Sequence, residues 1–236
     1  MRTLEVVILA ALLTACSREE PSASAIRSDA IVNPPMVKTN APPGVYTLDP
    51  ARTQVTFVVE YVNLTKVSAR FPEVEGSLQL DPDKPEGSVL AVTADARAIQ
   101  AAPGIAPVMQ SADFLDADRN PEIAFRSTRI MRTGPATADI TGDLTVRGQT
   151  RPVTLKAMLT GVTTPPPGEA GTARINFTAT GAIQRGRFAM DAMMPFAGDP
   201  AGVLDEVDVR IEASFVKDVR QAMAALNEGK AASASK

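Results

Sequence analysis

The chain has 236 residues, a net charge of −3, an apolar fraction of 44% and a charged fraction of 22%, which are ordinary values for a globular protein. It contains no histidine, which excludes a Ser-His-Asp triad, a Cys-His pair and any histidine-ligated metal site. Lysine and arginine are scattered and form no concentrated basic face, so the composition argues against nucleic-acid binding.

The N-terminus has the pattern of a secretory signal peptide that ends at a cysteine. A basic residue at position 2 precedes a short apolar run, Val6 to Leu13, and small residues lead from it to Cys16. The run is too short to span a bilayer, which needs about 20 apolar residues. The stretch LTAC resembles the lipobox of bacterial lipoproteins, in which the cysteine is lipidated. We therefore expect a signal peptide at 1–15 and lipidation at Cys16; a cleaved signal followed by a stray thiol is the alternative.

Such a lipid would anchor the protein in the bacterial cell envelope, facing the periplasm. The residue after the cysteine is Ser17 and not an aspartate. In related lipoproteins this permits sorting to the outer membrane. Residues 17–44 are rich in Ser, Ala and Pro without a sustained period, which indicates a disordered or extended tether. The sequence thus predicts a lipidated N-terminus and tether at 16–44, a globular part at 45–217 and a C-terminal helix and tail at 218–236.

From Tyr46 onward the dominant hydrophobic period is two residues, which is typical of strands with one buried face. Turn signals such as PDKPEG, RTGP and RGQTRP separate the apolar segments. Many evenly spaced strands in one chain indicate a closed antiparallel barrel or a sandwich. The expected strands are Tyr46–Leu48, Val55–Tyr61, Lys66–Phe71, Val74–Leu80, Ser88–Ala94, Glu122–Met131, Ala138–Val146, Val153–Leu159, Ala173–Ile183 and Glu206–Val216.

Two segments have helical patterns, Ile105–Leu115 and Val216–Asn227. An eight-stranded barrel is just wide enough to be filled by side chains or to hold one small ligand. Aromatic residues make up only 4% of this chain and many strand positions are Ala, Gly, Thr or Val. Linings of that kind favour an internal tunnel for a slender apolar molecule.

Three stretches resemble the signatures of the YceI-like family, in the family's order. They are SADFLDADRNPEIAFRSTRI, ITGDLTVRGQTRPVTL, and ATGAIQRGRFAM followed by DEVDVRIEASF. Members are bacterial, secreted, lipocalin-like barrels that bind long isoprenoid or amide lipids, and the resemblance covers about residues 45–217. It implies an eight-stranded antiparallel lipocalin-like barrel with a short helix near the mouth and a C-terminal helix.

The carboxylates of the first stretch, Asp113, Asp116 and Asp118, invite a metal or acid–base reading. Their spacing lacks the alternate-position oxygens and bidentate glutamate of a calcium loop. In the family this stretch is the passage from helix to strand near the barrel mouth. The resemblance therefore implies that Asp113 lies in the helix and that the other two shape its exit, as turn formers.

The chain also departs from the family pattern at polar positions. Arg52-Thr53 stands where members usually carry His-Ser, and residues 106–110 replace an Arg-Asp-x-His-Leu run. The usual Arg-Ser-Asp-Phe-Gly-Met is Arg-Gly-Arg-Phe-Ala-Met at 185–190. The apolar residues of the family pattern are present here, and the polar residues are replaced. The resemblance therefore implies the tunnel, but it implies no role that the family's polar groups have.

The apolar residues of the matching stretches are the candidate tunnel lining. Each is also a candidate for solid core, and Phe57 and Phe125, central in their strands, are the best candidates for the lining. We expect the lipid-binding residues to be Phe57, Val59, Phe71, Phe114, Leu115, Phe125, Leu144, Phe177, Phe188 and Met190.

Two further groups have alternative readings. Met190, Met193 and Met194 could form a thioether copper site, but adaptable filling of the barrel rim accounts for them as well, and no metal site is expected. Arg185 and Arg187 could meet a phosphate or carbonyl headgroup, or lie at a solvated strand end.

The sequence therefore predicts a protein that binds or carries a long apolar molecule and is not an enzyme. No cofactor is expected other than a bound isoprenoid lipid or quinone. The expected partners are this lipid and, through the N-terminal anchor, a membrane, while a homodimer is left open. The alternatives are a scaffold or stress-protective envelope module without a ligand and, ranked last, an enzyme acting on a bound lipid, because no base stands beside a nucleophile.

Overall fold

The computed structural model describes residues 41–62, 65–166, 171–195 and 201–218. The predicted signal peptide, Cys16 and the tether up to residue 40 lie outside these ranges, as does the predicted C-terminal helix beyond residue 218. Within them, no helix is long and apolar enough to cross a bilayer.

The described chain is almost entirely β-structure, with one short α-helix, α1 (Ile105–Gln110). The strands are β1 (Gly44–Leu48), β2 (Gln54–Tyr61), β3 (Thr65–Phe71), β4 (Val74–Leu80), β5 (Val89–Asp95), β6 (Gln100–Ala101), β7 (Glu122–Arg132), β8 (Thr137–Val146), β9 (Gln149–Thr163), β10 (Thr172–Gln184) and β11 (Val203–Asp218).

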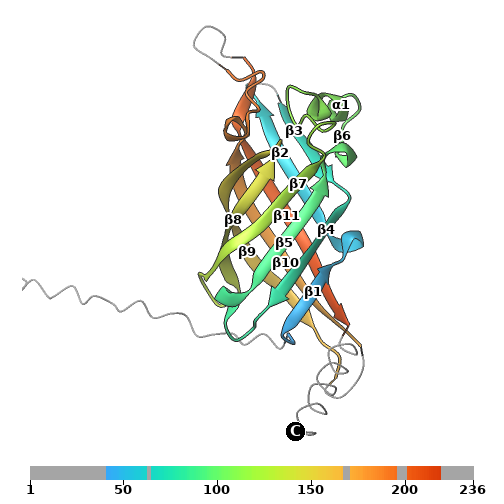
Figure 1. Cartoon of the computed structure of the whole chain (residues 1–236), viewed down its shortest axis with the longest axis vertical. Coiled ribbons are helices and arrows are strands. Elements are labelled where there is room, and N and C mark those ends of the chain that lie inside the picture. Colours follow the sequence, from blue (N-terminus) through green and yellow to red (C-terminus); the bar gives the residue numbers. More distant parts are fainter. Residues whose placement is uncertain (1–40, 63–64, 167–170, 196–200, 219–236) are drawn as a thin grey trace, which may run out of the picture. The chain divides into compact units, whose positions relative to one another are not determined.

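These strands form a closed eight-stranded antiparallel barrel (Figure 1). The ring runs β1-β4-β5-β7-β8-β9-β10-β11 and closes because β1 also pairs with β11. β2 continues β1 along the same partner, since Leu48 pairs with Phe215 and Gln54 with Glu212. β3 and β6 extend β4 and β5 in the same way, with Ala69 opposite Ala101. The predicted fold class, an eight-stranded antiparallel barrel, is confirmed.

The alternation of the sequence decides which face of each strand is inside. On β2, Val55, Phe57 and Val59 face the barrel interior, and the residues between them face outward. On β4 the predicted strand Val74–Leu80 is reproduced to the residue. A one-residue slip would turn every apolar side chain to solvent, so this pattern fixes the register.

The connection between β8 and β9 shows how local sequence closes a hairpin. Arg147 and Gly148 both have positive φ, 50° and 68°, as the two central residues of a type I′ turn require. Val146 pairs with Gln149 across it. Glycine meets this requirement without strain, which accounts for the turn signal read from RGQ.

The segment between β1 and β2, residues 49–53, is hydrogen bonded to the neighbouring strands β10 and β11. Arg174 Nη1 on β10 donates to Asp49 Oδ2 at 2.7 Å and to Ser214 Oγ on β11 at 2.6 Å. Ser214 N–H in turn donates to Thr53 Oγ1 at 3.2 Å. The hydrogen bond from Arg174 holds the pKa of the Asp49 carboxyl below its usual value.

The helix near the mouth is shorter than the predicted Ile105–Leu115. It ends at Gln110, because Ser111 is extended and its N–H and Oγ both donate to Val108 O. Asp113 therefore lies in the following turn and not in the helix, contrary to the prediction. Asp116 does shape the turn: it has a φ of 48°, and its carbonyl accepts from Asn120 N–H at 2.9 Å.

The C-terminal helix was predicted to begin at Val216, and this start is wrong. Val216 pairs with Thr47 of β1 and with Arg174 of β10, and β11 continues to Asp218. The pairing partners on both sides outweigh the helical spacing of the apolar residues here.

Candidate ligand-binding cavity

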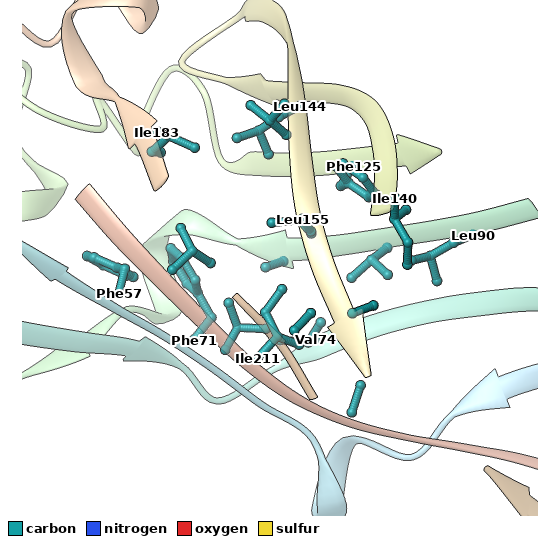
Figure 2. Close-up of a pocket in the computed structure, with 18 of the residues that line it drawn as sticks. Phe57, Phe71, Val74, Leu90, Phe125, Ile140, Leu144, Leu155, Ile183 and Ile211 are labelled. Atoms are coloured by element: carbon teal, nitrogen blue, oxygen red, sulfur yellow. The ribbon is translucent and has the colours of Figure 1, made fainter. Parts of the chain in front are cut away.

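The interior of the barrel is hollow and holds a cavity of about 580 Å³. Every position of the ring contributes inward side chains to its lining, and Figure 2 shows them converging from strands on all sides. At about 30 Å³ for each water-sized group, a volume of 580 Å³ takes roughly twenty methylene-sized groups. The cavity is thus large enough for a chain of about that many groups.

The cavity wall is apolar over its middle part. The labelled side chains in Figure 2 are all hydrocarbon: Phe57, Phe71, Val74, Leu90, Phe125, Ile140, Leu144, Leu155, Ile183 and Ile211. Among the described lining residues there is no Asp, Glu, Lys or Cys. A ligand held here is therefore recognised by apolar contact along most of its length.

Two glycines keep the bore of the cavity wide where large side chains face them. A Cβ at Gly142 would lie 2.5 Å from the ring of Phe125, and one at Gly181 would lie 2.7 Å from Leu155 Cδ2. The phenyl ring and the leucine therefore lie against the wall in the space that the glycines leave. This arrangement lets inward-facing bulky residues coexist with an open interior.

The structure brings nine of the ten predicted lining residues to the cavity. Phe57, Val59, Phe71, Phe114, Leu115, Phe125, Leu144, Phe177 and Met190 all line it. Phe57 and Phe71 form an aromatic pair with ring centroids 5.4 Å apart. Their role as lipid contacts stays a prediction; what the structure gives is their common orientation into one space.

Phe188 is placed differently. It belongs to the 3₁₀ helix η4 (Arg185–Phe188), is only 1% exposed and packs with Val146 and Met190 without lining the cavity. The strand alternation ends at Gln184, so the period-two rule no longer says which way residue 188 points.

Several lining residues were not among the predicted ones. They share the same origin, being inward positions of strands whose outer positions are polar, and the period-two pattern that identified Phe57 would have found them. Examples are Val55, Leu78, Ile140, Leu155 and Ile211.

The cavity lining extends to exposed residues at both ends of the barrel, which are called its openings below. At the end that carries α1 (Figure 1), lining residues Val108 and Met193 are 48% and 53% exposed. At the other end it is lined by Arg132, by exposed Pro135 and by Pro85 of the β4–β5 connection. Arg132 Nη2 donates there to Pro135 O at 3.2 Å.

Arg185 is buried, so of the two alternatives left open for it, the solvated strand end does not apply. It is 3% exposed. Its Nε donates to Leu204 O at 3.0 Å, Nη2 to Val203 O at 2.7 Å, and Nη1 to Met190 O and Ala192 O. Burial lowers the pKa of this guanidinium. Arg185 therefore fixes the backbone on one side of the α1-end opening, while Arg187 is exposed.

Met190 and Met193, two of the three methionines considered for a thioether site, lie in different surroundings. Met190 is 6% exposed in the cluster with Val146 and Phe188, whereas Met193 is 53% exposed at the opening. Within the described ranges, no group of three or more Cys, Asp or Glu side chains is arranged to hold a metal ion.

Comparison with known proteins agrees with this geometry. The model of the YceI-like domain matches residues 46–215. A UPF0312 protein of Pseudomonas putida strain GB-1 is 30% identical over 164 residues, which cover 69% of this chain and 80% of the relative. One of Pseudomonas syringae pv. tomato is 33% identical over 108 residues, covering 45% of this chain and 56% of the relative.

Solved structures share the fold at low identity. Burkholderia cenocepacia BcnA has a TM-score of 0.59 at 21% identity, covering 71% of this chain and 98% of BcnA. The YCEI protein of Campylobacter jejuni has a TM-score of 0.57 at 21% identity, covering 67% and 90%. A polyisoprenoid binding domain from Saccharophagus degradans, implicated in plant cell wall breakdown, has a TM-score of 0.51 at 11% identity, covering 72% and 97%.

Proposed function

The chain belongs to the YceI-like family, and from that premise we propose that it binds one long apolar lipid, of the isoprenoid class, inside the barrel. The single observation that carries this proposal is the cavity of about 580 Å³, whose middle is lined only by hydrocarbon. The binding of polyisoprenoid by a domain of the same fold adds support. An isoprenoid quinone meets the same description.

The affinity comes from burying the chain. Each methylene removed from water contributes about 0.8 kcal/mol, which is roughly a fourfold gain in affinity per carbon. In a cavity that takes about twenty such groups, affinity should increase with chain length up to about twenty carbons and then stay constant. Carbons beyond it protrude from an opening and gain nothing.

The proposed activity is binding and carriage, not catalysis. The lining offers hydroxyls such as those of Thr53, Ser88 and Thr137 and two guanidiniums, Arg132 and Arg185. Ser88 Oγ already accepts from Asp81 N–H and Thr53 Oγ1 from Ser214 N–H. No described lining carboxylate or lysine stands beside any of these hydroxyls as a base.

We further propose that the protein works in the bacterial cell envelope, held by a lipid on Cys16 and facing the periplasm, at the outer membrane. The support is the LTAC stretch at residues 13–16. Cys16→Ser should move the protein from the membrane fraction to the soluble or unprocessed one. A variant that still partitions with membranes as a cleaved, mature-sized species would refute the anchor.

A chain-length series tests the binding proposal directly. Purified, delipidated protein is titrated with polyprenols of two to eight isoprene units, and bound lipid is also extracted from the natively purified protein for mass spectrometry. Affinity should rise steeply to about four units, which is roughly the twenty carbons set by the cavity volume, and then level off. Failure of every length to bind, with an empty extract, would support a scaffold that holds no ligand.

A further inference from the structure

The opening at the α1 end is bordered by exposed apolar side chains. Val108 on α1 is 48% exposed and Met193, beyond η4, is 53% exposed, and both also line the cavity. Leu204, 37% exposed, follows Val203, whose N–H donates to Met193 O at 2.8 Å. These three residues, Val108, Met193 and Leu204, are called the rim below. They make up half of the six large hydrophobic side chains that are exposed in the described part of the chain.

The α1 side of this opening is also free of charge. From Ala98 to Ala112 the sequence contains no Asp, Glu, Lys or Arg, and α1 has no charged residue in its first or last turn. The opposite opening differs: Arg132 lines it, and the adjoining β4–β5 connection reads Leu-Asp-Pro-Asp-Lys-Pro-Glu-Gly at residues 80–87. The α1 side of this opening is thus suited to contact with hydrocarbon, while Asp191 and Asp205 lie close to Met193 and Leu204 in the sequence. The opposite opening is suited to contact with water.

The difference between the two openings matters for how a long apolar ligand enters and leaves the cavity. Release of a chain of about twenty carbons into water gives up the burial of every carbon, so exchange through the aqueous phase is very slow. Contact between the opening and a bilayer lets the chain pass from one apolar environment to another. The rim is continuous with the cavity wall, because Val108 and Met193 belong to both.

We propose that the α1 end of the barrel is a membrane-docking surface, on which Val108, Met193 and Leu204 enter the lipid interface so that the ligand passes directly between bilayer and cavity. This inference rests on the proposed lipid binding for its purpose, but docking itself can be measured without a ligand. The apolar rim and the uncharged helix beside it favour a lipid bilayer as the occupant of this surface.

The test compares rim variants with a control of equal exposure on the barrel wall. Val108→Glu and Leu204→Glu change the rim, and Leu204 does not line the cavity. Met158→Glu is the control, since Met158 is 48% exposed on β9 and does not line the cavity either. All are full-length chains that also carry Cys16→Ser, so that an N-terminal lipid does not itself bind membranes.

Two measurements are made with vesicles of phosphatidylethanolamine and phosphatidylglycerol: co-sedimentation of the protein, and the rate at which a fluorescent polyprenyl probe moves from protein to vesicles. The transfer rate should rise in proportion to vesicle concentration. It should fall roughly tenfold in both rim variants, with loss of co-sedimentation, and stay unchanged in Met158→Glu.

A transfer rate that is independent of vesicle concentration, or rim variants that behave like Met158→Glu, would overturn the docking proposal. So would a change of oligomeric mass in the rim variants without any change at vesicles, because the rim would then contact a second copy. A wild-type chain that binds no probe yet co-sediments through the rim would instead refute the proposed ligand and leave docking in place.

Discussion

Two phenylalanines that the sequence treats alike should respond differently to truncation, because one borders a void and the other does not. Phe57 and Phe188 were both expected to line the tunnel. Phe188 is 1% exposed and packed with Val146 and Met190, whereas Phe57 lines the cavity and contacts the ring of Phe71 at 5.4 Å between centroids. The perturbation is Phe→Ala at each position.

The two expected losses follow from how much new empty space each truncation creates. Phe188→Ala removes a fully packed ring and leaves a closed cavity, so it should lower the free energy of unfolding by about 3–5 kcal/mol. Phe57→Ala only enlarges space that is already open. It should lose the contact made with the wall and with Phe71, about 1–2 kcal/mol, since full burial of such a side chain is worth roughly 1.5–3 kcal/mol.

The assay is urea-induced unfolding of delipidated wild type and both variants, with the free energy taken by linear extrapolation. Saturation with a polyprenyl probe should then stabilise wild type more than Phe57→Ala, because that variant loses contact with the bound chain. Equal losses in the two variants, to within about 0.5 kcal/mol, would mean that the interior around Phe57 is packed solid in solution. The reasoning from a hollow barrel would then be wrong.

Three further outcomes are expected. Arg185→Met should lower the free energy of unfolding by about 3 kcal/mol, because the backbone carbonyls that it serves lose their donors, while exposed Arg187→Met should stay within about 0.5 kcal/mol in the same urea titration. Gly181→Ala should push a leucine into the bore and weaken probe binding with little loss of stability, and Gly161→Ala, whose Cβ would meet nothing closer than 3.4 Å, should do neither. Asp49→Asn should lower the melting temperature at neutral pH, because it removes the ion pair with Arg174. The pKa of Asp49 in the folded protein lies below 3.8, so the difference in melting temperature from wild type should be full above that pH and should shrink as the pH falls through the lowered pKa. A difference that stays constant down to pH 2 would contradict the ion pair.

The strands were predictable because one physical pattern governs them all. A barrel wall has one face toward the apolar interior and one toward water, so alternation at Val55–Tyr61 or Val74–Leu80 states both the strand and its inward face. The same pattern carried most of the candidate cavity residues. The register of the strands follows from the same pattern, because a shift by one residue would expose a whole row of apolar side chains to water.

The parts that failed are those where alternation stops. The end of α1 is set by Ser111, whose N–H and hydroxyl both donate to the carbonyl of Val108. These hydrogen bonds leave no periodic pattern in the sequence from which they could be predicted. Arg185 is buried because the carbonyls of residues 190, 192, 203 and 204 converge on it. Two of these carbonyls lie 18 and 19 residues from Arg185 in the sequence, and no local pattern predicts that they meet it.

The closure of the ring depends on a pairing between the two ends of the domain, and this long-range pairing bears on how the barrel folds. Most pairings along the wall join strands that lie close together in the chain, but β11 pairs with β1 and β2 at the other end of the domain. That last pairing brings Leu48 against Phe215, across nearly the whole length of the domain, and non-local contacts of this kind form slowly because loop closure must precede any gain. A sheet in which β11 has not yet paired with β1 and β2 has two unpaired edges and an apolar concave face, which makes it prone to associate with other chains. The strand that completes the cavity is therefore also the strand that ends the period of greatest aggregation risk.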